Sequence, residues 1–191
     1  LHDALPIYRL SIHLTLAFII ISSIFWLIIN FTNQTNKRFF NLDNLNRPYQ
    51  ILLILIFIQI ILGAFVSGLD AGQIYQTWPL MGQSYIPNDI ELSNTSNLSD
   101  FDNHSLVQFY HRNLAYIITF YIIILGFIVY RKKIKKLFYP FKLLIFFLVF
   151  QITLGILTLT SGLNIYLASA HQISSILLVL TAINLYYFRT K

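Results

Sequence analysis

Residues 49–67 read YQILLILIFIQIILGAFVS, an apolar run without a charged side chain. A helix of about 20 apolar residues crosses the roughly 30 Å hydrocarbon core of a bilayer. Four further runs have the same character, and like the first they contain no acidic residue: Leu10–Phe31, Leu106–Tyr130, Leu137–Thr160 and Tyr166–Phe188. Because unpaired strand edges cannot face lipid, these runs predict helices. The expected fold class is an all-α integral membrane protein with five transmembrane helices.

The composition of the 191 residues agrees with this fold class. Hydrophobic residues make up 57% and charged residues 10%, whereas soluble domains carry about 25% charged residues. This argues against a water-soluble globule, and the apolar content argues against a disordered chain. There is no cysteine, which excludes disulfide scaffolds, thiolate metal sites and cysteine nucleophiles. The net charge of +6 does not indicate a nucleic-acid partner, because the basic residues lie between apolar runs.

The charges of the connecting segments predict an orientation in the membrane. Loop 68–105 is acidic and contains no Lys or Arg, whereas the connection between the first and second runs, the connection between the third and fourth runs and the C-terminal tail are basic. The positive-inside rule places basic segments on the cytoplasmic or matrix side. Loop 68–105 is then expected on the periplasmic or intermembrane side. The basic residues are Lys37, Arg38, Arg47, Arg131, Lys132, Lys133, Lys135, Lys136, Lys142, Arg189 and Lys191.

A short motif occurs twice. QIILG at residues 59–63 and QITLG at residues 151–155 each lie in an apolar run. Each run is followed, across the outer side, by another that carries a histidine near its outer end, His111 or His171. The repeat of a helix pair with its histidine predicts a bundle with pseudo-twofold symmetry.

Three histidines, His13, His111 and His171, lie one to two turns inside the outer ends of their spans. A polar, ionisable side chain within a span is costly and is a functional candidate. Imidazole is a good iron ligand, and two histidines on facing helices of a bundle can hold a haem from both sides. Arg112 lies at the outer boundary, where its guanidinium would suit a haem propionate.

Other interpretations remain open for these residues. A single intramembrane histidine often only hydrogen-bonds a neighbouring helix, and a haem-free transporter would also use such groups. The spans contain no Asp or Glu to pair with the histidines, which disfavours the transporter. Asp70 lies at a helix exit between Gly68 and Gly72, where we expect it close to a buried site.

Several of these segments resemble the haem A synthase family, in the form found in mitochondria and many Gram-negative bacteria. The most specific are GAFVSGLDAG at 63–72 and YQTWPLMG at 75–82, which resemble the family's outer-loop signature. The resemblance runs from about Tyr8 to the C-terminus and does not include Leu1–Ile7. Its other parts are residues 8–17, VQFYHR at 107–112, residues 154–159, and Leu167-Ala168 with His171-Gln172.

The resemblance implies a fold of eight transmembrane helices in two four-helix halves. The five spans would be helices four to eight. Residues 1–48 would then be the last helix of the substrate-haem half with an inner linker, and residues 49–191 the haem b half. The chain begins at Leu1 and its single methionine is Met81, so we expect an N-terminally truncated fragment.

The resemblance also implies an activity. Haem A synthase is an oxidoreductase that converts a methyl group of haem O to a formyl group, giving haem A for terminal oxidases. His111 and His171, with Arg112, would hold haem b and its iron. His13 would be a ligand-position histidine for the substrate haem, and Asp70 and Gln172 would support the site. The catalytic glutamate of the family is expected outside this chain, so the fragment alone would be inactive.

The implied setting is a bacterial inner membrane or the mitochondrial inner membrane. Expected partners are membrane lipid, haem O, haem O synthase and further copies of the chain, and the sequence indicates no electron donor. The absence of cysteine argues against the family variant with a redox cysteine pair. The alternative function is a membrane cytochrome b that carries electrons from a quinol, since it would use the same histidines.

Overall fold

A computed structural model of the chain describes residues 4–40, 43–90 and 97–190. Within these ranges the chain is helical and contains no β-strand, only an isolated bridge between Met81 and Ser84. The long helices are α1 (Ala4–Thr32), α2 (Arg47–Gly68), α3 (His104–Arg131), α4 (Phe138–Thr160) and α5 (Ile165–Arg189). Short 3-10 helices are η1 (Ala71–Gln73), η2 (Asn97–Ser99) and η3 (Lys135–Leu137).

Each long helix is apolar and long enough to cross a membrane. The prediction of an all-α protein with five membrane spans is therefore confirmed. Four helices extend beyond the predicted apolar runs; α1, for example, begins at Ala4 rather than Leu10, whereas α4 is one residue shorter than its predicted run. Loop 69–103 joins α2 to α3, close to the predicted bounds of 68–105.

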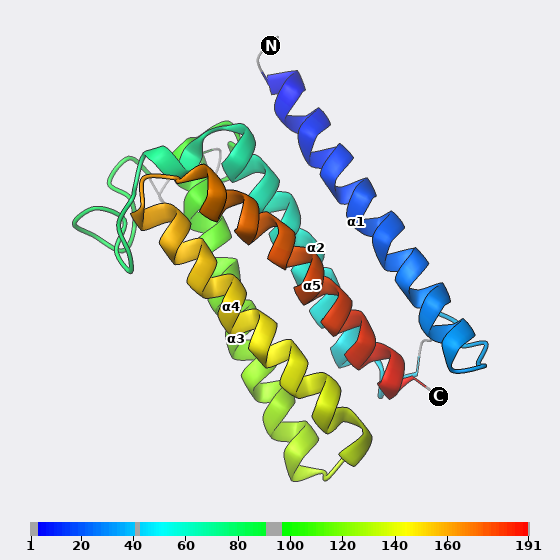
Figure 1. The fold of residues 1–191 in the computed structure, drawn as a ribbon. Helices are drawn as coiled ribbons and strands as arrows, with labels where there is room; N and C mark the ends of the chain where they lie inside the picture. Colours follow the sequence, from blue (N-terminus) through cyan, green and yellow to red (C-terminus); the bar gives the residue numbers. More distant parts are fainter. Residues whose placement is uncertain (1–3, 41–42, 91–96, 191) are drawn as a thin grey trace.

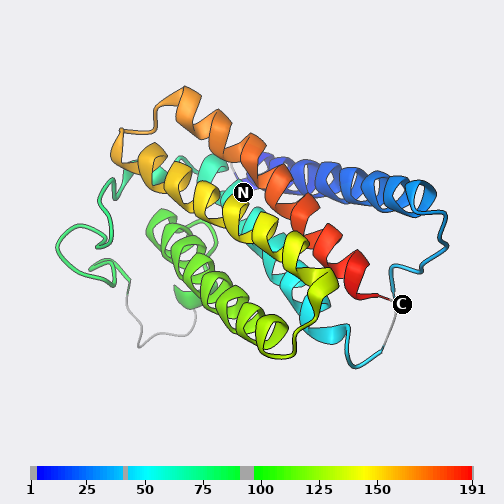
Figure 2. The same cartoon turned by 60° about the horizontal axis from the view of Figure 1, so that its bottom comes forward.

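The helices form two antiparallel pairs and a fifth helix at the side. The pairs α2 with α3 and α4 with α5 have the most extensive contacts. Figures 1 and 2 show α1 along one side of this group, where it contacts α2 and α5. Loop 69–103 and the turn between α4 and α5 lie at the same end of the group (Figure 1). We call this the outer end.

Large apolar side chains face both inward and outward. Ile122, Leu144 and Ile183 are fully buried between the helices. At the same time Phe31 is 87% exposed and Tyr166 is 82% exposed. Many other large apolar side chains of the helices are exposed too, which in water would be a large apolar surface. This distribution suits a multi-pass membrane protein whose outer surface is covered by lipid.

Lys37, which follows α1 in the connection to α2, binds the C-terminal end of α5. Its Nζ donates to the main-chain oxygens of Tyr187, at 3.1 Å, and Thr190, at 2.6 Å, and lies 4.4 Å from the centre of the Tyr187 ring. Trp26 Nε1 donates to the Lys37 carbonyl at 3.1 Å. Burial lowers the pKa of Lys37, and the nearby charge of Lys136 adds to this. These bonds satisfy carbonyls that the last turn of a helix leaves unpaired.

Close packing of α3 against α4 depends on a glycine. A Cβ at Gly126 would lie 2.5 Å from Cζ of Phe141, whose ring is buried.

Because of this contact we expect Gly126→Ala to lower the free energy of unfolding by about 1–3 kcal/mol through overpacking. Thermal unfolding of the detergent-solubilised protein measures this change. A second substitution, Phe141→Leu, should recover most of the loss, and equal unfolding temperatures for Gly126→Ala and the unsubstituted chain would contradict this packing.

Candidate functional site: a histidine pair near the outer end

His111 lies on α3, seven residues from the helix start and so about 10 Å along the axis. The neighbouring helix α2 presents Gln59 to it. The Gln59 amide Nε2 donates to the His111 main-chain oxygen at 2.9 Å and lies 3.4 Å from the ring Nε2. The ring Nδ1 of His111 and the Oε1 of Gln59 are buried and have no hydrogen-bond partner among the described residues.

His171 lies on α5, six residues from the helix start, and α4 presents Gln151 to it. The Gln151 amide Nε2 is 3.3 Å from the ring Nε2. The ring Nδ1 is 3.1 Å from the Gln151 main-chain oxygen. The hydroxyl of Ser174, one turn along α5, donates to the Gln151 side-chain oxygen. The second pair of helices therefore repeats the histidine–glutamine contact of the first.

A glycine accompanies each glutamine one turn further along the same helix. A Cβ at Gly63 would lie 3.1 Å from Cε1 of His111, and a Cβ at Gly155 would lie 2.9 Å from Cε1 of His171. Real Cβ atoms rarely come this close to another atom. The imidazoles therefore lie against α2 and α4 at places where only a glycine leaves room. The repeated motif Gln-x-x-x-Gly therefore forms the surface that a histidine contacts on each helix pair. We call this surface, Gln59 with Gly63 or Gln151 with Gly155, a histidine seat.

The two rings come from α3 and α5, the second helix of each pair, and each lies near the outer end of its helix (Figure 1). This agrees with the predicted pseudo-symmetry of the helix pairs. Among the described residues no three His, Asp or Glu side chains converge on one point. The site is therefore a pair of imidazoles, and His13 is not part of it.

Arg112, next to His111, binds the outer loop. Its guanidinium donates to the main-chain oxygens of Tyr75, at 2.9 Å, and Leu80, at 3.3 Å. The Gln108 amide also donates to the Tyr75 oxygen, at 2.9 Å. The Tyr75 hydroxyl in turn donates to Asp89 at 3.0 Å, and burial, followed by this bond, raises the pKa of Tyr75. The loop is thus tied over the start of α3, beside the histidine pair.

The remaining predicted site residues lie elsewhere. His13 is exposed on α1, Gln172 is exposed on α5, and Asp70 is exposed beyond the end of α2. None of these side chains has a hydrogen bond within the described part of the chain. Asp70 has a left-handed backbone, with φ of 52°, so its role is at least to turn the chain from α2 into η1. Their proposed functional roles stay predictions.

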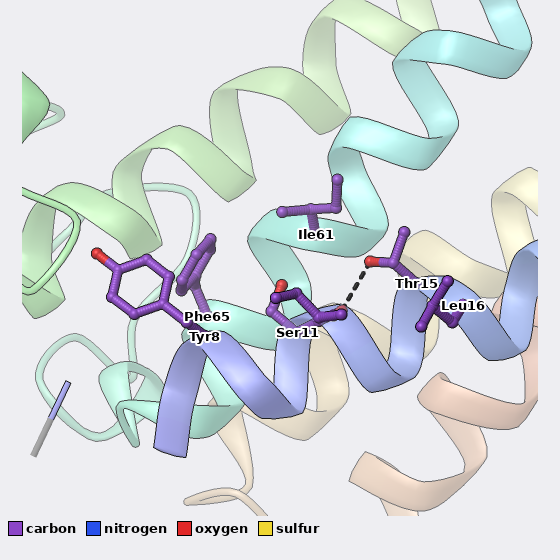
Figure 3. Close-up of a pocket in the computed structure, with 7 residues that line it drawn as sticks. Tyr8, Ser11, Thr15, Leu16, Ile61 and Phe65 are labelled. Carbon is purple, nitrogen blue, oxygen red and sulfur yellow. Dashed lines mark hydrogen bonds between the residues drawn. The ribbon is translucent and has the colours of Figure 1, made fainter. Parts of the chain in front are cut away.

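An apolar groove lies between α1 and α2, with a cavity volume of about 270 Å³. Figure 3 shows Tyr8, Ser11, Thr15 and Leu16 of α1 on one side and Ile61 and Phe65 of α2 on the other. Thr15 donates to the Ser11 carbonyl within α1 at 2.7 Å. No histidine and no charged side chain lines the groove, so it is separate from the histidine pair.

Gln59, Gln151 and Ser174 were not identified as site residues from the sequence. The signal was present, because the repeat begins with the two glutamines and ends with the two glycines. A polar amide inside an apolar span needs a partner, and a histidine at equal depth on the next helix is a suitable one. Gln172, the sequence neighbour of His171, is exposed.

These features define a multi-pass membrane protein that has two histidines inside its spans and an outer loop bound to α3 by Arg112. Residues 3–183 match the COX15-CtaA family model, described as cytochrome oxidase assembly protein. The chain therefore belongs to this family. The match includes residues 3–7, which the sequence analysis left outside the resemblance.

Curated relatives agree with the family match. The chain is 46% identical over 176 residues to "Heme A synthase" of Pelagibacter ubique, covering 90% of this chain and 50% of the relative. It is 37% identical over 172 residues to "Heme A synthase" of Wolbachia pipientis wMel, covering 90% and 47%. A third, from Rickettsia felis, is 34% identical over 184 residues, covering 94% and 54%. The chain thus spans about half the length of the curated relatives it matches.

Removing the Arg112 guanidinium should release the outer loop. In Arg112→Ala the carbonyls of Tyr75 and Leu80 lose their charged donor, a contact worth about 1.5–3 kcal/mol. We expect faster amide hydrogen exchange in residues 75–82, with little change along α4 and α5. Arg131→Ala, at the opposite end of α3 where Arg131 lies over the Phe127 ring, is the control. Unchanged exchange in residues 75–82 would show that Arg112 does not hold the loop.

Proposed function

We propose that this chain is the haem b-binding part of a haem A synthase, in which His111 and His171 would hold the haem iron. The observation that carries the proposal is the paired imidazole seat. One ring on α3 and one on α5 lie against glycines of α2 and α4 at similar depth, and a buried ring nitrogen of His111 has no protein partner among the described residues. Neutral imidazoles of this kind form a donor set that suits haem iron.

The protein side of the proposed site has three parts. His111 and His171 would hold the iron, Gly63 and Gly155 give the rings their room, and the loop bound by Arg112 shields the outer end. Arg112 also supplies positive charge at the outer boundary, which would favour a haem propionate nearby. Haem would supply the redox chemistry when bound, and the protein would tune it through the two histidines and the groups that contact them.

The names of the relatives support the whole activity as a proposal. The complete protein would oxidise a methyl group of haem O to a formyl group, giving haem A. His13, exposed on α1, would face the substrate haem together with residues that lie outside these 191. The chain alone would bind haem b without completing the reaction. Haem O synthase, an electron donor and further copies of the chain are proposed partners.

The proposed location is a membrane that holds a terminal oxidase, such as a bacterial inner membrane. The acidic loop 69–103 would face the periplasm or intermembrane space, and the basic connections would face the cytoplasm or matrix. The histidine pair would then lie in the outer half of the bilayer. The Lys37 fastening of α1 to α5 would lie at the inner surface.

A chimaera tests the activity. Residues 8–191 replace the matching segment of the Pelagibacter ubique relative, and the product is expressed with haem O synthase in a bacterium that lacks haem A synthase. We expect haem b bound to the purified protein and haem A in the extracted pigment. A chimaera that binds haem b and accumulates normally, yet makes no haem A, would contradict the proposal. Haem b alone with rapid quinol oxidation would instead support the cytochrome b.

A further inference from the structure

The turn between α4 and α5 lies against the first residues of the outer loop. A Cβ at Gly72 would lie 2.8 Å from Cδ2 of Leu163, and a Cβ at Gly162 would lie 3.7 Å from Oε1 of Gln76. Figures 1 and 2 show this turn beside the loop. Gly72 is buried, although it belongs to the short helix η1 within the connection from α2 to α3. The contact therefore joins the pair α4–α5 to the loop that follows α2.

The same segment of the loop is also bound to the first helix pair. The short helix η1 contacts both α2 and α3, and its first residue, Ala71, is fully buried. Just beyond η1, the main-chain oxygen of Tyr75 accepts hydrogen bonds from Gln108 and Arg112 of α3, both at 2.9 Å. Residues 71–76, which we call the strap, therefore contact both helix pairs at the outer end.

Direct side-chain contacts between the two helix pairs are found toward the inner end. The Gln50 amide in the first turn of α2 donates to the Tyr186 hydroxyl near the end of α5, at 2.9 Å. The rings of Tyr130, near the end of α3, and Phe138, at the start of α4, have centres 4.6 Å apart. The two histidines lie near the opposite ends of α3 and α5, where the strap makes the connection.

Leu163 keeps an unfavourable backbone conformation at this contact. Its φ is 63°, in the left-handed region where the Cβ of a bulky residue is crowded and glycine or asparagine is usual. Gly72, in contrast, is not among the residues with positive φ, so its backbone does not require glycine. The contact between them explains both residues, because it needs a large side chain at 163 and none at 72.

We propose that the strap sets the spacing of α3 and α5 at the outer end, with Leu163 and Gly72 as the positioning residues that bind it to the second helix pair. Helix pairs that pack together at one end can pivot about that end, and a contact at the other end removes this freedom. Because each histidine lies on the second helix of its pair, the same spacing sets how far apart the imidazoles are. Only this consequence for haem rests on the proposed function.

Distances between spin labels test the spacing without haem. The chain has no cysteine, so Ile117→Cys on α3 and Ile173→Cys on α5, both at exposed positions, take labels specifically. Leu163→Gly relieves the backbone of the turn but removes the side chain from the strap. We expect it to broaden the distance distribution and to speed amide exchange in residues 71–76 about tenfold. An unchanged distribution, or the slower exchange that an unstrained turn alone would give, would overturn the inference.

A matched control and a reciprocal exchange separate the contact from a general loosening. Lys133→Gly relieves a left-handed residue, with φ of 50°, in the connection at the inner end, and should leave the label distances unchanged. Gly72→Val displaces the Leu163 side chain and should broaden them. Adding Leu163→Ala to Gly72→Val should narrow them again, because valine fills the space that leucine leaves. Equal broadening by Lys133→Gly, or no recovery in the double variant, would overturn the inference.

Haem-loaded chain gives a second measurement that separates the strap from the proposed function. In Leu163→Gly we expect the low-spin ferric signal in electron paramagnetic resonance to spread over a wider range of g values, because the two imidazoles are held less uniformly. A chain that binds no haem, yet shows the expected label distances, would contradict the proposed function and support the strap. A chain that binds haem with label distances and g values unchanged by Leu163→Gly would overturn the strap alone.

Discussion

A polar ring placed inside a membrane must find its partners within the protein. In this chain each imidazole of the pair meets a glutamine from the antiparallel neighbouring helix, because the surrounding hydrocarbon offers no hydrogen bond. The contact requires two helices to approach closely, and glycine at 63 and at 155 permits that approach. The need of each imidazole for a hydrogen-bond partner therefore constrains how the helices are rotated about their axes and which residues lie between them.

The rest of the structure keeps these helix pairs in place. Lys37 joins the inner end of α1 to the last turn of α5, and Gly126 lets α3 and α4 pack against each other. At the outer end Arg112 and Gln108 bind the same loop carbonyl, that of Tyr75. The loop thus depends on the residue next to His111, so that His111 and the two side chains that bind the loop come from one short stretch of α3.

The sequence predicted the spans correctly, because a span depends on local information; it also singled out His111 and His171, whose haem-binding role stays a prediction. Length and hydropathy define a span, and a histidine within it is conspicuous. The partners of the histidines depend on how neighbouring helices are rotated, which no single span reveals. Gln172 was named as a supporting residue through the family resemblance, whereas Gln151, across the helix pair, makes the contact with His171. Arg112 binds main-chain oxygens of the loop. Such a contact depends on the path of the loop and not on its residue types, so the sequence does not reveal it.

The central claim is that His111 and His171 can hold one haem iron between them. Near-infrared magnetic circular dichroism of the oxidised, unsubstituted chain tests it most directly, because the charge-transfer band of a low-spin ferric haem identifies its two axial ligands. The account predicts the band of bis-imidazole coordination. A band of mixed histidine–water or histidine–methionine coordination in haem-loaded protein would contradict it.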